Sequence, residues 1–357
     1  MSLQRFVEHP WTHWMKGEGP DSDIVISTRL RIARNLRHHP FPLLATDSQA
    51  EEVVRKVEEV NQSASMKKKG QFELLRMEEL QPLEKKVLVE KHLISPNLAE
   101  ESRKGAVILS EDEAISVLIN EEDHLRIQVF LPGFQLKEAW DIGSKIDDVF
   151  EKQLNYAFDE KRGYLTSCPT NVGTGIRSSI MLHLPALVMT QQINRILQAT
   201  TQVGLVVRGL YGEGSEAVGN LFQLSNQVTL GMSEGDIITN LYSVASQIIV
   251  QEREAREYLR EHNQISLEDR IYRSYGILTH ARTIESKEAA QRLSDVRLGI
   301  DLGYFPTCNP FVVNELLVST QPGFLQYDAG QKLTVDQRDE RRARVIRERL
   351  ISPSEIS

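Results

Sequence analysis

Short stretches of alternating or continuous apolar residues run through the first two-thirds of the chain, a pattern typical of β-strands. Two of them, 114–120 and 124–130, flank an acidic turn, and a third, 106–110, comes just before. This spacing predicts antiparallel pairing of neighbouring strands. Further strands are expected at 72–77, 85–95, 181–187, 204–212 and 220–231.

Helical spacing of apolar residues interrupts the strands at 141–163, which ends on Gly163, and at 189–202. Residues 61–71 are mostly polar and are expected to form a loop. The mixture predicts the α+β class: a central antiparallel sheet flanked by helices, and not a regular βαβ series.

The pattern changes near Ser233, after which nearly every segment has the three- and four-residue apolar spacing of a helix. A long amphipathic helix is expected over 233–262, and further helices within 265–303 and 335–350. We therefore predict two domains, 1–255 and a helical C-terminal domain at 256–357.

Composition and charge narrow the possible functions. Of 357 residues, 40% are hydrophobic, and no stretch reaches the roughly 18 consecutive apolar residues that span a bilayer. The net charge of −8 argues against nucleic-acid binding by the whole molecule. The first residues lack the apolar segment of a secretory signal, and two cysteines, Cys168 and Cys308, cannot build a disulfide framework or a cysteine-based zinc site. We expect a cytoplasmic protein with no membrane contact and no metal site of its own.

Arginines are the first candidates for chemistry. Five lie at expected strand ends or loop edges: Arg29, Arg31, Arg126, Arg177 and Arg208. Arg29 and Arg31 are two residues apart in a strand, so both point to one face. A single such arginine is usually a solvated surface residue, and the glycine-rich element at 168–179 lacks the third glycine of a dinucleotide fingerprint. If the five converge, they would bind a ligand with several negative charges, such as a nucleoside triphosphate.

Two acidic turns could hold a cation opposite the phosphates. Residues 120–124 place three carboxylates in a hairpin turn, and residues 211–216 place Glu213 among glycines. Each turn alone is more simply a solvated turn. Together with the arginines, they indicate a cationic substrate held beside a triphosphate.

Three segments, 118–127, 163–187 and 206–219, together resemble the catalytic domain of the phosphagen (guanidino) kinases in order and spacing. The resemblance covers about residues 20–250. It implies the fold of that family and phosphoryl transfer from ATP to a guanidinium group, with Mg²⁺ arriving on the nucleotide.

The resemblance also implies roles for single residues. Glu122 matches the carboxylate that clamps the guanidinium and acts as base, Glu213 matches a second guanidinium carboxylate, and Cys168 matches an active-site thiolate. Arg126, Arg177 and Arg208 match catalytic arginines. The implied ATP-binding positions are Ser27, Thr28, Arg29, Leu30, Arg31, His92 (near the adenine), Arg126, Arg177, Ser178, Ser179, Ile180, Met181, Arg208, Gly209, Leu210, Tyr211, Gly212 and Glu213.

Two departures make the chain similar to bacterial protein arginine kinases of the McsB type. Only a short segment precedes the strand with Arg29 and Arg31, where small-molecule phosphagen kinases carry a helical domain, and those kinases lack a helical C-terminal addition. The element Arg338, Asp339, Glu340, Arg341, Arg342 and Ala343 fits the allosteric phosphoarginine pocket of McsB-type kinases. From the residues alone it is a basic helix paired with its own carboxylates.

The resemblance further implies a homodimer, protein substrates with exposed arginine, a zinc-binding activator protein, and delivery of marked proteins to a Clp-type ATPase and protease in the stress response.

The pKa of a guanidinium exceeds about 12, whereas that of a glutamate is about 4.3. Full deprotonation by Glu122 before attack would therefore cost about 11–13 kcal/mol. We expect the proton to reach Glu122 late, as the N–P bond forms, with Mg²⁺ bridging the β- and γ-phosphate oxygens.

Three other functions stay open on the sequence. A kinase of a small free guanidino compound would use the same residues, and a non-catalytic phosphoarginine-binding adaptor would use only 338–343. Nucleic-acid binding by the C-terminal arginine helix is disfavoured by the net charge and by the lack of interleaved aromatic residues.

Overall fold

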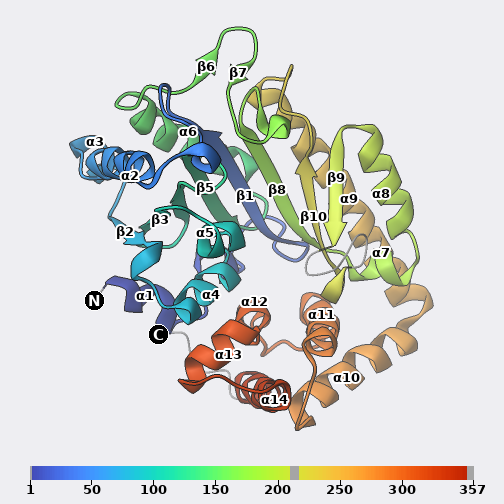
Figure 1. Cartoon of the computed structure of the whole chain (residues 1–357). Helices are drawn as coiled ribbons and strands as arrows, with labels where there is room; N and C mark the ends of the chain where they lie inside the picture. Colours follow the sequence, from blue (N-terminus) through green and yellow to red (C-terminus); the bar gives the residue numbers. More distant parts are fainter. Residues whose placement is uncertain (1, 210–216, 352–357) are drawn as a thin grey trace.

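The computed structural model describes residues 2–209 and 217–351 (Figure 1). Within these residues an eight-stranded antiparallel sheet has the order β2-β3-β4-β5-β1-β8-β10-β9, which confirms the predicted α+β class. Its strands are β1 (Val25–Arg34), β2 (Phe72–Arg76), β3 (Ala106–Ser110), β4 (Ile115–Ile119), β5 (Leu125–Pro132), β8 (Ile176–His183), β9 (Leu205–Gly209) and β10 (Leu221–Asn226). A separate small hairpin pairs β6 (Phe158–Asp159) with β7 (Gly163–Tyr164).

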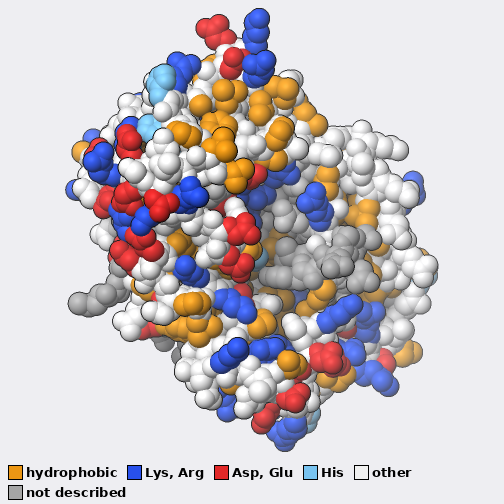
Figure 2. Space-filling model, in the orientation of Figure 1, with side chains coloured by type: hydrophobic (Ala, Val, Ile, Leu, Met, Phe, Trp, Pro, Cys, Tyr) orange, Lys and Arg blue, Asp and Glu red, His pale blue; other side chains and the backbone are white. Residues whose placement is uncertain are grey.

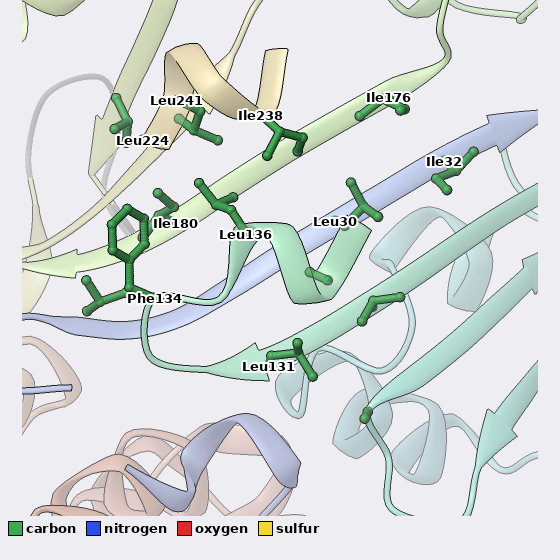
Figure 3. Close-up of a cluster of buried hydrophobic side chains, with 14 of the residues drawn as sticks. Leu30, Ile32, Leu131, Phe134, Leu136, Ile176, Ile180, Leu224, Ile238 and Leu241 are labelled. Carbon is green, nitrogen blue, oxygen red and sulfur yellow. The ribbon is translucent and has the colours of Figure 1, made fainter. Parts of the chain in front are cut away.

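The central strand β1 separates a core face from a polar face of the sheet. Leu30 and Ile32 of β1 are fully buried against α6 (Leu136–Glu151) and α9 (Glu234–His262), together with Ile180 of β8 (Figure 3). A Cβ added at Gly143 of α6 would lie 2.5 Å from Leu30 Cδ2, so α6 packs very closely on this face. These two helices lie behind the sheet in Figure 1.

A second apolar cluster covers one end of the opposite face. Trp14 of the short helix η1 (His13–Lys16), Phe130 of β5, Met181 of β8 and Phe311 of α12 (Pro310–Ser319) are all buried in it. This cluster leaves the end of the face near Arg31 uncovered, and the candidate site lies there.

The C-terminal helices pack below the sheet in Figure 1. They are α10 (Gln264–His280), α11 (Ser286–Asp301), α12, α13 (Pro322–Ala329) and α14 (Val335–Ile351). Their contact with the rest of the chain includes partly buried hydrogen bonds: Arg297 donates to the Ser22 carbonyl at 2.5 Å, and the amides of Gly323 and Phe324 donate to the Glu90 carboxylate at 2.7 and 2.8 Å. The predicted domain boundary at residue 255 falls within α9 and stays a prediction.

The remaining helices connect the strands: α1 (Ser2–Glu8), α2 (Asp47–Asn61), α3 (Ala64–Lys67), α4 (Pro82–Glu90), α5 (Pro96–Glu100), α7 (Pro185–Met189) and α8 (Ile193–Gln202). Among the described residues, no helix has both the length and the apolar run needed to cross a bilayer.

Two expected strands are wrong in part or in whole. Residues 85–95 begin in helix α4, because Pro82 at its first turn and a capping box between Gln81 and Glu84 start a helix ahead of the apolar run. Residues 185–187 belong to α7, where Pro185 again occupies the first turn.

Two other expectations also need correction. The helix expected over 141–163 is α6, which begins at Leu136 and ends at Glu151, while Gly163 lies in β7. The expected loop 61–71 contains α3, because Ser63 caps the Met66 amide and Met66 is fully buried.

Candidate active site

A cavity of about 340 Å³ opens on the uncovered end of the polar face. Its lining residues are Arg31, Ala33, Glu122, Arg126, Cys168, Thr170, Asn171, Gly175, Arg177 and Arg208. The structure thus brings together four of the five predicted arginines with Glu122 and Cys168. Figure 2 views this face and shows basic side chains in a hollow at its centre, beside acidic ones.

Strand register explains why these arginines converge. Arg31 on β1 lies directly opposite Gln128 on β5 and directly opposite Arg177 on β8, and residues that face each other across antiparallel strands share a face. Arg29 is the next residue of β1 on this face and pairs with Phe130. The row therefore places guanidinium groups from neighbouring strands side by side.

This crowding of positive charge has an electrostatic cost. Loss of water, with the charges of Arg29, Arg126 and Arg177 added, lowers the pKa of Arg31 well below its ordinary value. Loss of water also lowers the pKa of Arg29, to about 10, and the pKa of Arg177. Glu121 offsets part of this repulsion, and since guanidinium groups stay charged in proteins, bound negative charge would relieve more of it, so the cavity favours a polyanion.

Acidic side chains hold Arg126 at the edge of the cavity. Its Nη1 donates to Glu121 Oε1 and its Nη2 to Glu122 Oε2, both at 2.8 Å. Glu121 is buried and also accepts a bond from the Ser95 hydroxyl at 2.5 Å, whereas the Glu122 side chain is 38% exposed and faces the cavity. Glu121 is therefore structural, whereas Glu122, although paired with Arg126, is exposed where a ligand in the cavity can contact it.

Asp123 ties the acidic turn to the loop that carries Cys168. Its Oδ1 accepts from Asn35 Nδ2 at 2.6 Å and from the Ser167 amide at 2.7 Å. Burial raises the pKa of Asp123, and these two donors offset part of that effect. Cys168 Sγ lies 3.0 Å from Thr170 Oγ1. Asp123 thus holds together the two loops that carry Glu122 and Cys168.

The glycine-rich element approaches β1 too closely for any other residue. Gly175 has φ +67°, and a Cβ there would lie 2.6 Å from the Ala33 carbonyl oxygen. Arg34 fixes the turn by donating to the Thr174 carbonyl at 2.9 Å and by an ion pair with Asp147 at 2.7 Å. The chain then enters β8 with Arg177 directed to the cavity.

The other predicted nucleotide residues divide between the two faces. Ser179 lies opposite Arg29 and Met181 opposite Ser27, so these share the polar face. Thr28, Leu30, Ser178 and Ile180 lie on the core face. His92 is half-buried against Trp14 and Phe130 and does not line the cavity. Gly209 ends β9, whereas Leu210, Tyr211, Gly212 and Glu213 lie outside the described residues.

Within the described ranges, no group of three or more His, Cys, Asp or Glu side chains is placed to hold a metal ion.

A second cavity, of about 540 Å³, lies in the C-terminal helices. It is lined by Arg282, Thr283, Leu333, Gln337, Glu340, Arg341, Arg344 and Arg347. Of the predicted element, only Glu340 and Arg341 line it. Arg341 also pairs with Asp328 of α13 at 2.6 Å.

The rest of the predicted element supports this cavity from behind. Arg342 is buried and donates to the carbonyls of Thr320 and Ile284 at 3.0 and 2.9 Å. Asp339 pairs with Arg342, Ala343 lies in the core, and Arg338 donates to the Leu333 carbonyl at 3.1 Å. These four residues therefore shape α14 and its surroundings more than they line the cavity.

Comparison with known proteins decides the family. The family model of the ATP:guanido phosphotransferase C-terminal catalytic domain matches residues 52–255, and that of the protein-arginine kinase McsB C-terminal domain matches residues 264–356. The chain belongs to the McsB protein-arginine kinase family. It is 77% identical over 350 residues to a protein-arginine kinase of Brevibacillus brevis, with 98% of each chain covered, and 63% identical to one of Halalkalibacterium halodurans, again with 98% of each covered.

Solved structures show the fold of the catalytic part of this McsB family member. A substrate-free duplicated taurocyamine kinase from Schistosoma mansoni has a TM-score of 0.58 at 23% identity, covering 72% of this chain and 39% of that chain. Lombricine kinase has a TM-score of 0.57 at 21% identity, covering 70% and 75%.

Sequence reasoning missed several residues at both cavities of this McsB family member. Thr170 and Asn171 lie in the glycine-rich element and were available from the motif. Gln337, Arg344 and Arg347 share the helical spacing of Glu340 and Arg341, so periodicity alone could have found them. Arg282 and Thr283 come from the link between α10 and α11 and carry no such signal.

Proposed function

We propose that this protein transfers the γ-phosphoryl group of Mg·ATP to arginine guanidinium groups of proteins. One observation carries the proposal: guanidinium groups from four strands face the Glu122 carboxylate and the Cys168 thiol across one cavity. The names of relatives at 77% and 63% identity agree with it.

The arginines supply the phosphate side of the site. Arg31, Arg177 and Arg208 would bind the triphosphate by charge-assisted forks and stabilise charge on the transferring group. Mg²⁺, when bound with the nucleotide, would add positive charge between the β- and γ-phosphate oxygens. Since the described residues hold no cluster of carboxylates, histidines and thiols for a metal, the nucleotide would carry most of its ligands.

Glu122 supplies the acceptor side. In the structure it pairs with Arg126, which Glu121 holds from behind. We propose that phosphate draws Arg126 away from Glu122, so that the substrate guanidinium takes that place. Glu122 then orients one terminal nitrogen towards the γ-phosphorus and accepts its proton as the N–P bond forms and the bond to ADP breaks. Glu213, outside the described residues, would be the second carboxylate on the guanidinium.

The first experiment gives purified protein Mg·ATP together with an unstructured arginine-containing protein or free arginine. Mass spectrometry at neutral pH then locates acid-labile phosphate. We expect phosphate on protein arginine. Phosphate on free arginine alone would instead support a small-guanidino-compound kinase, and none on either, with phosphoarginine still bound, would support a non-catalytic adaptor.

The mechanism has its own test. Glu122→Gln should keep ATP affinity nearly intact, because the phosphate arginines are unchanged, while transfer falls by orders of magnitude. Wild-type turnover in this variant would remove Glu122 from its role.

We also propose that the second cavity binds phosphoarginine as an allosteric effector. Arg282, Arg341, Arg344 and Arg347 would bind the phosphate, and Glu340 the guanidinium. Arg341→Ala should blunt stimulation by added phosphoarginine and leave basal activity largely in place. Equal loss of both would indicate a structural role for α14.

Family membership is the support for the remaining proposals: a cytoplasmic homodimer, a zinc-binding activator protein, and delivery of arginine-phosphorylated proteins to a Clp-type ATPase and protease during stress. Addition of such a protease to phosphorylated and unphosphorylated substrate would test the last of these, because only the phosphorylated form should be degraded.

A further inference from the structure

Gln128, at the middle of β5, uses every hydrogen-bonding group of its side chain. Its Oε1 accepts from both Nε and Nη2 of Arg29, the first at 2.8 Å. Its Nε2 donates to the His92 carbonyl at 2.8 Å and to the Ser116 hydroxyl at 3.3 Å. The residue is 1% exposed, so water does not compete for these bonds.

The chemistry of the neighbours fixes which way this amide points. A guanidinium has only donors, so the oxygen must face Arg29, and a carbonyl has only an acceptor, so the nitrogen must face His92. Glutamate would satisfy Arg29 but would lose the donor to the His92 carbonyl. Methionine, which has a similar length, would satisfy neither. Glutamine therefore meets both demands at this position.

The groups that hold Arg29 are neutral, in contrast to those that hold Arg126 and Arg34. Arg126 is paired with two carboxylates and Arg34 with Asp147. Across the described residues Arg29 has no ion pair with a carboxylate, and it lies over the Phe130 ring at 5.7 Å. Its position is thus fixed while its full positive charge remains available.

The far end of the amide is anchored at a turn of unusual backbone conformation. His92 follows α4 with φ +62°, a left-handed conformation that a non-glycine residue adopts only when its surroundings require it. Its ring packs edge-on against Phe130 at 6.1 Å, which places the carbonyl beside β5. The turn, Gln128 and Arg29 therefore form one rigid chain of contacts behind the cavity.

We propose that Gln128 is a positioning residue that aims Arg29 at the nucleotide phosphates without neutralising it. This inference rests on the proposed function, because it takes the polyanion of the cavity to be ATP. Gln128 lies directly opposite Arg31, which lines the cavity. Arg29 does not line the cavity itself, but it is the next guanidinium on the same face of β1, where phosphates that extend beyond the cavity along β1 would meet it.

The test measures the affinity for Mg·ATP by displacement of a fluorescent ATP analogue, and separately the KM for ATP and kcat with a protein substrate. Gln128→Met should weaken ATP affinity about tenfold, since a bond to a charged group is lost, with a smaller change in the KM for the protein substrate. Gln128→Glu should weaken it more, because a carboxylate neutralises Arg29 and repels phosphate. Ser116→Ala is the matched control: it removes the other side-chain partner of Gln128 but leaves Arg29 untouched, so ATP affinity should stay within about twofold.

A double-mutant cycle separates positioning from folding. In an Arg29→Ala background, Gln128→Met should cost little further affinity, because Gln128 acts through Arg29. An equal cost with and without Arg29 would overturn the inference, as would wild-type affinity in Gln128→Glu if Gln128→Met fails to fold. Failure of the proposed function looks different: the wild type would bind Mg·ATP and phosphorylate no arginine, and the affinity cycle would still decide the role of Gln128.

Discussion

Acid should destabilise this protein through a histidine next to the candidate site. His124 ends the acidic turn and is 1% exposed. Its Nδ1 accepts from the Leu36 amide at 3.0 Å, so the proton of the neutral ring lies on Nε2, which donates to the Pro40 carbonyl at 3.0 Å. A second proton, on Nδ1, would place the N–H of the ring against the N–H of the Leu36 amide. Burial accordingly lowers the pKa of His124 to about 4.

The size of the effect follows from the pKa values in the two states. The unfolded ring takes up a proton near pH 6.5 and the folded ring only near pH 4, so acid favours the unfolded chain. The stabilisation is complete above pH 6.5 and is lost as the pH falls towards 4. The full loss is about 3 kcal/mol, of which about 2 kcal/mol is reached at pH 5. His92 and His183 also have lowered pKa values and add to this loss, whereas buried carboxylates with raised pKa values, such as Asp123 and Glu252, act in the opposite direction.

The variant His124→Asn isolates the contribution of this one ring to the pH dependence of the free energy of unfolding. Its Oδ1 can still accept from the Leu36 amide, but it does not titrate. Urea unfolding at pH 7.5 and 5.0, followed by tryptophan fluorescence, should show that the wild type loses about 2 kcal/mol more than the variant. Ile127→Val, a buried change in β5, the strand that follows His124, should lower stability by about 1 kcal/mol at both pH values and leave the pH dependence unchanged. Equal losses in the wild type and His124→Asn would refute the reasoning.

Three further predictions concern the core, the glycine turn and the thiol. Glu252→Ala should lower the free energy of unfolding by about 3–5 kcal/mol in urea titrations, because the buried Arg256 loses its nearer carboxylate, at 2.9 Å, and the Ala186 and Leu187 amides lose their acceptor; a loss below about 1 kcal/mol would contradict this. Gly175→Ala should weaken ATP binding about tenfold, since its Cβ would lie 2.6 Å from the Ala33 carbonyl oxygen at φ +67°, and titration with the fluorescent ATP analogue would show it. Iodoacetamide should inactivate the kinase by alkylating Cys168, which lines the cavity, more slowly when Mg·ATP is bound; intact-mass analysis follows the reaction, and equal inactivation of Cys168→Ser would show another target.

Much of the candidate site could be predicted, because side chains alternate between the two faces of a strand and the sequence alone shows which residues share a face. Arg29 and Arg31 alternate with Leu30, and the structure places the arginines on one face and the leucine in the core. The same rule, applied to all of 27–31 and 177–181, would have removed Leu30 and Ile180 from the side chains expected at the nucleotide. A motif of consecutive residues includes side chains on both faces of a strand, whereas a ligand contacts the side chains on only one face.

The wrong strand assignment and the functional residues that the sequence did not indicate have causes in local and in tertiary structure. The apolar run in 85–95 has no period that separates a buried strand from a buried helix, and the cap at Gln81 that starts α4 lies outside the run. Arg282 reaches the second cavity only because α10 and α11 fold back on α14. Gln128 is uncharged and central in a strand, so nothing in its type marks it as functional until the register places it beside Arg29.

The balance of charges couples the phosphate side of the first cavity to its acceptor side. In the structure, Arg126 pairs with Glu121 and Glu122, while Arg29 is held by a neutral amide. Under the proposed function, the triphosphate therefore meets Arg29 already oriented and unpaired, and Arg126 still engaged. Moving Arg126 to phosphate leaves Glu122 without a cation, and a substrate guanidinium restores the balance. Each substrate thus removes an electrostatic obstacle to the other, so ATP and the acceptor arginine should bind with positive cooperativity even if neither moves the backbone.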